Sequence, residues 1–127
     1  NDILIDMGNS TRTHVDSFKD AFAGLAWVVK TQPNFKVHLL LATIAIILSW
    51  YFQITRVEFA VIIFTIVLGL TAEMINTSIE SMTDLITTEY RESAKIAKDV
   101  AAGMMLTAAI GALLVAIVIF VPHILFP

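Results

Sequence analysis

Three long apolar runs dominate the pattern of hydrophobic and polar positions, and short polar stretches separate them. The runs cover residues 37–52, 59–87 and 100–121. A helix needs about 20 predominantly apolar residues to cross the hydrocarbon core of a bilayer. The first run is short, but Lys36 can extend it by reaching the interface with its charged end. The pattern therefore predicts an all-α membrane protein with three transmembrane helices in each chain.

The connections between the runs differ in length and polarity. Residues 53–58 are too few for more than a tight turn, so the first two spans should form an antiparallel hairpin. Residues 88–99 are polar and are expected to be helical. Pro122 should end the third span, because proline cannot continue a helical hydrogen-bond ladder.

An amphipathic pattern precedes the first run. Within residues 16–31, apolar residues recur with the spacing of one helix face, at Phe18, Phe22, Leu25 and Val29. This predicts a helix that lies on the membrane surface, either as an anchor alone or also as a cover for a site. Pro33 disfavours the helical conformation for the residue before it. We therefore expect a break at Gln32.

The domain organisation is simple. Residues 1–15 are polar and aperiodic, which predicts a flexible N-terminus. Met7-Gly8 is the expected natural start, which would make residues 1–6 an addition. We interpret residues 16–127 as one integral-membrane domain, because a chain of 127 residues leaves no room for a separate soluble catalytic domain.

Basic residues are distributed unevenly around the three runs. Of the eight Lys and Arg residues, only Arg56 lies between the first two runs. Lys and Arg accumulate on the cytoplasmic side of membrane proteins. The distribution predicts a cytoplasmic N-terminus, a C-terminus outside, and the connection over residues 88–99 in the cytoplasm.

Composition narrows the possible chemistry. The chain is 57% hydrophobic, has a net charge of −3 and contains no cysteine. Disulfides, Cys-ligated zinc and thiol nucleophiles are therefore excluded. An acidic chain without a basic run also argues against nucleic acid as a partner.

Acidic residues interrupt the cytoplasmic half of the second run. On a helix of about 100° per residue, one face carries Glu73, Asn76, Glu80 and Asp84. Ionisable residues in a membrane span are costly and indicate a functional site by default. The alternative is a solvated acidic helix end, which suits residues beyond Leu85 best.

Carboxylates, an amide and nearby lysines suit a divalent cation that carries phosphates. Magnesium prefers oxygen ligands, commonly one or two carboxylates with phosphate oxygens and water. Lys95 and Lys98 could face the phosphates as point charges. Neither a Walker A motif nor a kinase-type Gly-rich loop is present. A lipid-facing phosphotransferase and an ion or proton pathway both remain open from the residues alone.

The motif E-x-x-N-x-x-I-E-x-x-x-D over residues 73–84, followed by Ala97-Lys98-Asp99, resembles the signature of the small prokaryotic integral-membrane diacylglycerol kinases. Residues 33–38 (PNFKVH) are similar to the Gram-positive branch, whose members act as undecaprenol kinases. The resemblance implies a homotrimer in the bacterial plasma membrane with sites between subunits. It implies ATP with Mg²⁺ as donor and a membrane lipid alcohol, undecaprenol, as acceptor. Diacylglycerol is the alternative acceptor, and a non-catalytic membrane protein or ion pathway is the remote alternative.

The resemblance also implies roles for single residues. Glu73 would be the base toward the lipid hydroxyl, with Asn76 beside it, and Glu80 would hold the metal. Nucleotide binding would fall to Lys98 and Asp99 and, on the loop side, to Asp84, Glu89 and Glu92. His38 is expected to be a hydrogen-bonded residue at the span end rather than a metal ligand.

Gln32 departs from the family pattern. The family places a glutamate three residues before Phe35, where it contributes to the metal site. An amide is a neutral and weaker magnesium ligand than a carboxylate. The resemblance therefore predicts that this chain, with Gln32 in the metal site, is impaired as an enzyme.

Overall fold

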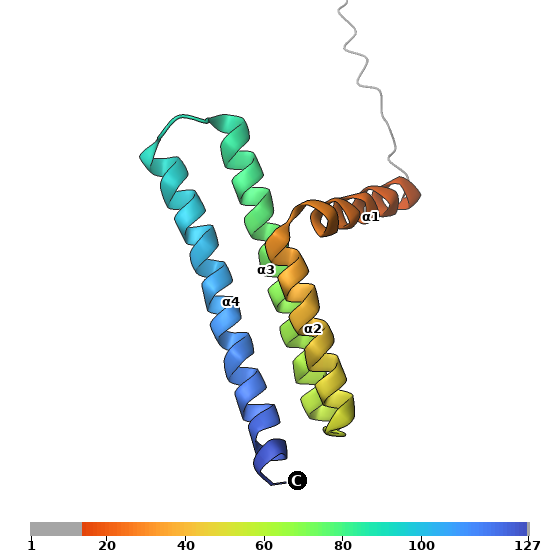
Figure 1. Cartoon of the computed structure of the whole chain (residues 1–127). Coiled ribbons are helices and arrows are strands. Elements are labelled where there is room, and N and C mark those ends of the chain that lie inside the picture. The colour runs from red at the N-terminus through yellow and green to blue at the C-terminus, as the bar shows by residue number, and fades with distance from the viewer. Residues whose placement is uncertain (1–13, 127) are drawn as a thin grey trace, which may run out of the picture. The chain divides into compact units, whose positions relative to one another are not determined.

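The computed structural model describes residues 14–126, which form four helices and, within that range, no strand (Figure 1). The helices are α1 (His14–Thr31), α2 (Pro33–Tyr51), α3 (Arg56–Ile86) and α4 (Glu92–Leu125). The last three are long and apolar enough to cross a membrane, which confirms the three predicted spans. The expectations for residues 1–6 and for Met7-Gly8 lie outside the described residues.

The chain divides into two compact units, one ending at Thr31 and the other beginning at Gln32. The first contains α1, which starts two residues before the amphipathic pattern does. At its last residue, the Thr31 hydroxyl donates a hydrogen bond to the Trp27 carbonyl, one turn earlier, at 2.8 Å. A helix is present where the pattern predicted one, and its place on the membrane surface stays a prediction.

The second unit begins at the break that Pro33 predicted. Gln32 is the N-cap of α2 and has extended backbone angles, with φ −98° and ψ 109°. Pro33 occupies the first helical position, where its missing N–H leaves no hydrogen bond unmade. Helix α2 therefore begins four residues before the apolar run.

A short turn joins α2 to α3. Gln53 adopts a positive φ of 49°, which reverses the chain. Thr55 and Glu58 then form a capping box: the Glu58 N–H donates to Thr55 Oγ1 at 3.3 Å, and the Thr55 N–H donates to Glu58 Oε2 at 2.8 Å. The predicted turn over residues 53–58 is wrong at its end, because this box starts the helix at Arg56.

The connection between α3 and α4 corrects a second expectation. Residues 88–91 are not helical, although residues 88–99 were predicted to be. Thr87 is extended, and its hydroxyl accepts a hydrogen bond from the Glu89 N–H at 3.1 Å, which favours a turn over another helical residue. Helix α4 begins at Glu92 and includes the rest of the polar stretch.

Pro122 does not end α4, which corrects a third expectation. The helix continues to Leu125, and the Phe126 N–H donates to the Pro122 carbonyl at 2.9 Å. Proline removes only its own donor and restricts the residues before it. One further turn can therefore form after it.

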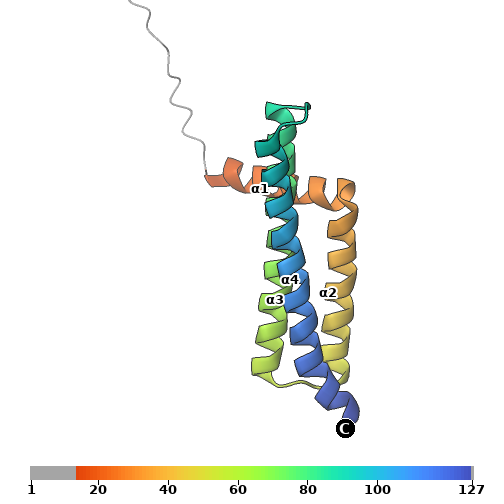
Figure 2. The same cartoon turned by 90° about the vertical axis from the view of Figure 1, so that its left-hand side faces the viewer.

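Helices α3 and α4 lie side by side and antiparallel in one register along their length (Figures 1 and 2). At the loop end, Lys98 pairs with Asp84. At the other end, Ile62 packs with Ile119 and Phe120 in the buried core. Because one residue along α3 matches one residue back along α4, the register places Glu73 opposite Ala109.

Helix α2 packs on α3 and covers only part of it. A Cβ atom built on Gly69 would lie 3.7 Å from His38 Nδ1. From this contact, the antiparallel register places Pro33 about level with Met74. Figure 2 shows α3 and α4 continuing beyond the start of α2. Helix α2 is about 28 Å long, close to the hydrocarbon thickness of a bilayer, and Glu73 lies level with its first residues.

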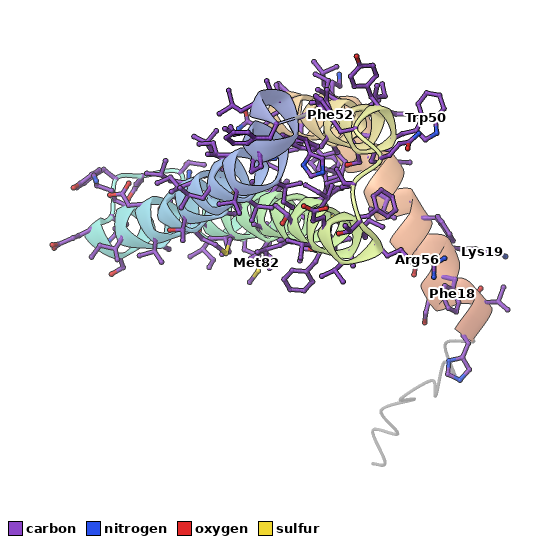
Figure 3. The ribbon with its side chains drawn as sticks, turned by 90° about the horizontal axis from the view of Figure 1, so that it is seen from below. Phe18, Lys19, Trp50, Phe52, Arg56 and Met82 are labelled. Atoms are coloured by element: carbon purple, nitrogen blue, oxygen red, sulfur yellow. The ribbon has the colours of Figure 1, made fainter. Side chains whose placement is uncertain are left out.

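The core lies at the end of the bundle away from the α3–α4 loop. The Phe52 ring packs near Phe120, with ring centroids 6.3 Å apart. Trp50 instead points away from the helices and is 82% exposed (Figure 3). The site described next lies toward the opposite, polar end.

Candidate functional site

The predicted acidic face of α3 is graded in burial. Glu73 is 2% exposed and Asn76 is 7% exposed, whereas Glu80 and Asp84 are exposed. Exposure along this face therefore rises from Glu73 toward Asp84. The four polar residues therefore lead from the bundle interior to its open end.

Two buried oxygen atoms of this face lack a hydrogen-bond partner. They are Oε2 of Glu73 and Oδ1 of Asn76. Buried polar atoms are nearly always paired, so each unpaired one requires an explanation, such as a catalytic role or a missing ligand. The Asn76 amide nitrogen does have a partner, since it donates to Glu80 Oε1 at 3.2 Å. The interaction holds Asn76 with its free oxygen turned away from Glu80.

The first turns of α4 bring basic side chains to the open end of the acidic face. Lys98 Nζ lies 2.6 Å from Asp84 Oδ1, which joins α4 to α3. Lys95 pairs with Asp99 within α4. Both lysines are thus beside carboxylates, and their charges are partly balanced before any phosphate binds.

A hollow of about 510 Å³ lies at the loop end of α3 and α4, within the volume range of small-molecule sites. Three hydroxyl groups and one guanidinium group lie among the lining residues, which are Thr83, Ile86, Thr87, Arg91, Ser93, Ala94 and Ala97. Sequence reasoning missed Thr83, Thr87, Arg91 and Ser93 as candidate site residues. Their polarity in a loop was the available signal, but it did not distinguish them from other exposed residues.

The loop residues of the predicted site are less closely assembled. Glu89 pairs with Arg91 at 3.3 Å, and both side chains are exposed. Glu92 is exposed in the first turn of α4. The structure therefore brings together Glu73, Asn76 and Glu80, and separately Asp84 and Lys98. It does not bring Glu89, Glu92 or Asp99 to the lining of the hollow, and Asp99 pairs with Lys95 instead.

An apolar groove of about 330 Å³ runs between α2, α3 and α4 on the membrane side of Glu73. Small residues of α4 make room for it, including Ala108, Ala109 and Ala112. His38 is the only ionisable residue among those that line it. The groove thus joins a polar end beside the acidic face to an apolar interior.

The donor set fits magnesium better than a metal that needs many protein ligands. Residues 14–126 contain no group of three or more His, Cys, Asp or Glu side chains that could hold a metal ion without other ligands. Magnesium commonly takes one or two carboxylates and completes its shell with phosphate oxygens and water. Glu80 offers a carboxylate and Asn76 an unpaired oxygen. By the register of α2 on α3, Gln32 lies about level with Ile75. Its backbone is therefore close to the level of Asn76.

Comparison with known proteins decides the family. The family model for prokaryotic diacylglycerol kinase matches residues 19–120. The chain belongs to this family. The match confirms the resemblance that the motif over residues 73–84 indicated, and it identifies the chain as a member of a family of lipid kinases.

Similar proteins are named for two different lipid substrates. The chain is 37% identical over 110 residues to a diacylglycerol kinase of Synechocystis, covering 86% of this chain and 63% of that protein. It is 32% identical over 118 residues to the undecaprenol kinase of Bacillus subtilis, covering 92% and 95%. It is also 32% identical over 88 residues to a diacylglycerol kinase of Haemophilus influenzae, covering 68% and 75%. The chain thus spans less than two thirds of the Synechocystis protein.

Proposed function

We propose that this chain transfers the γ-phosphoryl group of ATP to a membrane lipid alcohol, with undecaprenol as the acceptor. The observation that carries the proposal is the pair of unpaired buried oxygens, Glu73 Oε2 and Asn76 Oδ1, on the acidic face of α3. They lie near the level where α2 begins, at one edge of the membrane layer. A lipid alcohol places its hydroxyl at that boundary and its tail in the hydrocarbon.

In the proposed reaction Glu73 is the base. Its carboxylate accepts the proton of the lipid hydroxyl as the hydroxyl oxygen forms a bond to the γ-phosphorus. The bond from that phosphorus to the bridging oxygen breaks, and ADP leaves with the electron pair. Phosphoryl transfer depends mainly on positioning and charge stabilisation, and general base catalysis adds about 10²- to 10⁴-fold. Asn76 orients the reacting groups beside Glu73.

The nucleotide is proposed to bind at the open end of the bundle. Its triphosphate would face Lys98, exchanging the Asp84 pair for phosphate contacts, while the hollow beside Arg91 and Ser93 accommodates the rest. Asp99, Glu89 and Glu92 are proposed to contribute to nucleotide binding from outside the lining of this hollow. Mg²⁺, held by Glu80 with oxygens of Asn76 and Gln32, would neutralise phosphate charge when bound.

Two observations favour undecaprenol over diacylglycerol. The match to the Bacillus undecaprenol kinase covers 95% of that protein, more than for either diacylglycerol kinase. Residues 33–38 also have the pattern of the Gram-positive branch. Diacylglycerol stays the second candidate because the Synechocystis relative is 37% identical.

The proposal also covers the membrane location and the oligomeric state of the protein. The Lys and Arg distribution supports a bacterial plasma membrane protein with its N-terminus and the α3–α4 loop in the cytoplasm. Helix α1 would lie on that membrane surface. A homotrimer with sites between subunits would complete the enclosure of nucleotide and lipid.

Radiolabelled ATP in detergent–lipid micelles tests the function directly. The acceptors are undecaprenol, diacylglycerol and a shorter polyprenol, each with the parent chain and with Gln32→Glu. We expect label in undecaprenyl phosphate above all others. Preferential labelling of diacylglycerol would replace the acceptor, and absence of label from every lipid in both forms would contradict the kinase assignment.

A further inference from the structure

His38 is a polar residue to which the proposed chemistry assigns no role. It lies in the second turn of α2, half-buried at the polar end of the apolar groove. Its Nδ1 is 3.7 Å from the position that a Cβ atom of Gly69 would occupy. Gly69 is itself buried, so the imidazole lies against the backbone of α3.

Gly69 precedes Glu73 by one helical turn on the same face of α3. Side chains of a helix lean toward its N-terminus. Glu73 therefore leans back over Gly69, while His38 leans toward the start of α2. Because the two helices are antiparallel, these directions converge. Glycine has no side chain, so position 69 itself places no group beside the imidazole.

The electrostatic surroundings of Glu73 favour the same pairing. His38 is the ionisable side chain of α2 that lines the groove beside this face, and Glu80 lies two turns further along α3. Helix α4 contributes no charge at this level, since its residues opposite Glu73 are alanines. Lys36 on α2 is exposed, and Lys98 pairs with Asp84 at the open end. His38 is thus the available hydrogen-bond donor for the deepest carboxylate.

We propose that His38 is a positioning residue for Glu73, donating an imidazole N–H to the Glu73 carboxylate beside Gly69. This rests on the proposed function, in which Glu73 is the base. Catalytic hydrogen bonds often reach their full geometry only in the reacting complex, so this one is expected to form when the substrates bind. The contact fixes the direction of the carboxylate, so that its second oxygen faces the lipid hydroxyl.

Kinetics of His38→Ala and His38→Gln test the role, in the more active of the Gln32 and Gln32→Glu backgrounds. We expect His38→Ala to lower kcat about tenfold or more, a loss expected when a reacting group is misplaced, with the KM for ATP unchanged. His38→Gln should recover part of kcat, because its amide can donate the same hydrogen bond. The matched control is His123→Ala, which removes the histidine at the other end of the bundle and should keep full kcat.

A kcat of His38→Ala equal to that of the His123→Ala control would overturn the proposal, as would equal losses in His38→Ala and His38→Gln with normal folding. A second measurement needs no activity. In the ¹⁵N-histidine spectrum, Glu73→Gln should shift the His38 ring signals and leave those of His123 in place. Unshifted His38 signals would also overturn the proposal. If the chain labels no lipid, the kinase function fails, and the spectrum still decides whether the two residues meet.

Discussion

A carboxylate at position 73 is costly, since it is buried with one oxygen unpaired. The cost is understandable if the unpaired oxygen receives the acceptor proton. We predict that Glu73→Gln keeps ATP binding and lowers the rate of lipid phosphorylation by about 10²- to 10⁴-fold. The measurements are nucleotide affinity by calorimetry and transfer from radiolabelled ATP.

The matched control for this variant is Glu58→Gln, which makes the same change in the first turn of α3. Glutamine also satisfies a capping box, so this control should keep both stability and activity. Retention of most of the parent turnover by Glu73→Gln would exclude Glu73 as the base. Both variants are compared in the Gln32→Glu background if the parent is too slow.

Gln32 carries the second prediction for a single residue. A glutamate there would add a charge near Glu80 and give magnesium two carboxylates. We predict that Gln32→Glu raises the rate at least about tenfold, equivalent to ~1.4 kcal/mol of transition-state stabilisation, and lowers the magnesium concentration for half-maximal rate. A magnesium titration of lipid phosphorylation measures both effects.

The control is Gln53→Glu, which adds the same charge in the turn between α2 and α3. It should change neither the rate nor the magnesium dependence. Equal rates and equal magnesium dependence for the parent and Gln32→Glu would mean that position 32 is not part of the metal site.

Among the elements, the start of α3 offers a test of local structure. The Thr55 hydroxyl accepts the Glu58 N–H, which would otherwise lack a helical partner. We predict that Thr55→Ala lowers the free energy of unfolding by about 1 kcal/mol, whereas Thr55→Ser loses little. Reversible unfolding in mixed micelles measures the difference. Equal stability of the alanine and serine variants would show that the box does not determine the helix start.

The elements also show what sequence could and could not predict. The spans followed from apolar run length, and the break at Gln32 followed from Pro33. Three predictions were wrong: the end of the first turn, the helical conformation of residues 88–91, and the end of the third span at Pro122. Each depends on single hydrogen bonds, such as Thr87 with Glu89, that periodicity does not contain.

The sequence likewise predicted some features of the candidate site and not others. The shared face of Glu73, Asn76 and Glu80 follows from helical periodicity. The approach of His38 to Gly69 does not, because it depends on the register between two helices. The burial of Glu73 likewise depends on how the helices pack against one another. Patterns within one helix therefore predicted which candidate residues share a face but not their surroundings.

For the whole molecule, a single chain leaves the proposed active site open to solvent. Glu80 and Asp84 are exposed in the single chain, although charge stabilisation is strongest where water is excluded. The three spans of one chain enclose the apolar groove only in part. Small residues on α4, including Gly103 and Gly111, would allow another helix to approach closely.

We therefore predict an active homotrimer in which neighbouring chains complete each site. Native mass spectrometry in detergent should give a trimer, and cross-linking should give the same state in membranes. Mixed assembly of Glu73→Gln chains with Lys98→Met chains should restore part of the activity that each lacks alone, because a site between subunits can combine an intact Glu73 with an intact Lys98. A fully active monomer would contradict the assembly. A trimer without restored activity would place Glu73 and Lys98 of each site in the same chain, as the Lys98–Asp84 contact within one chain would allow.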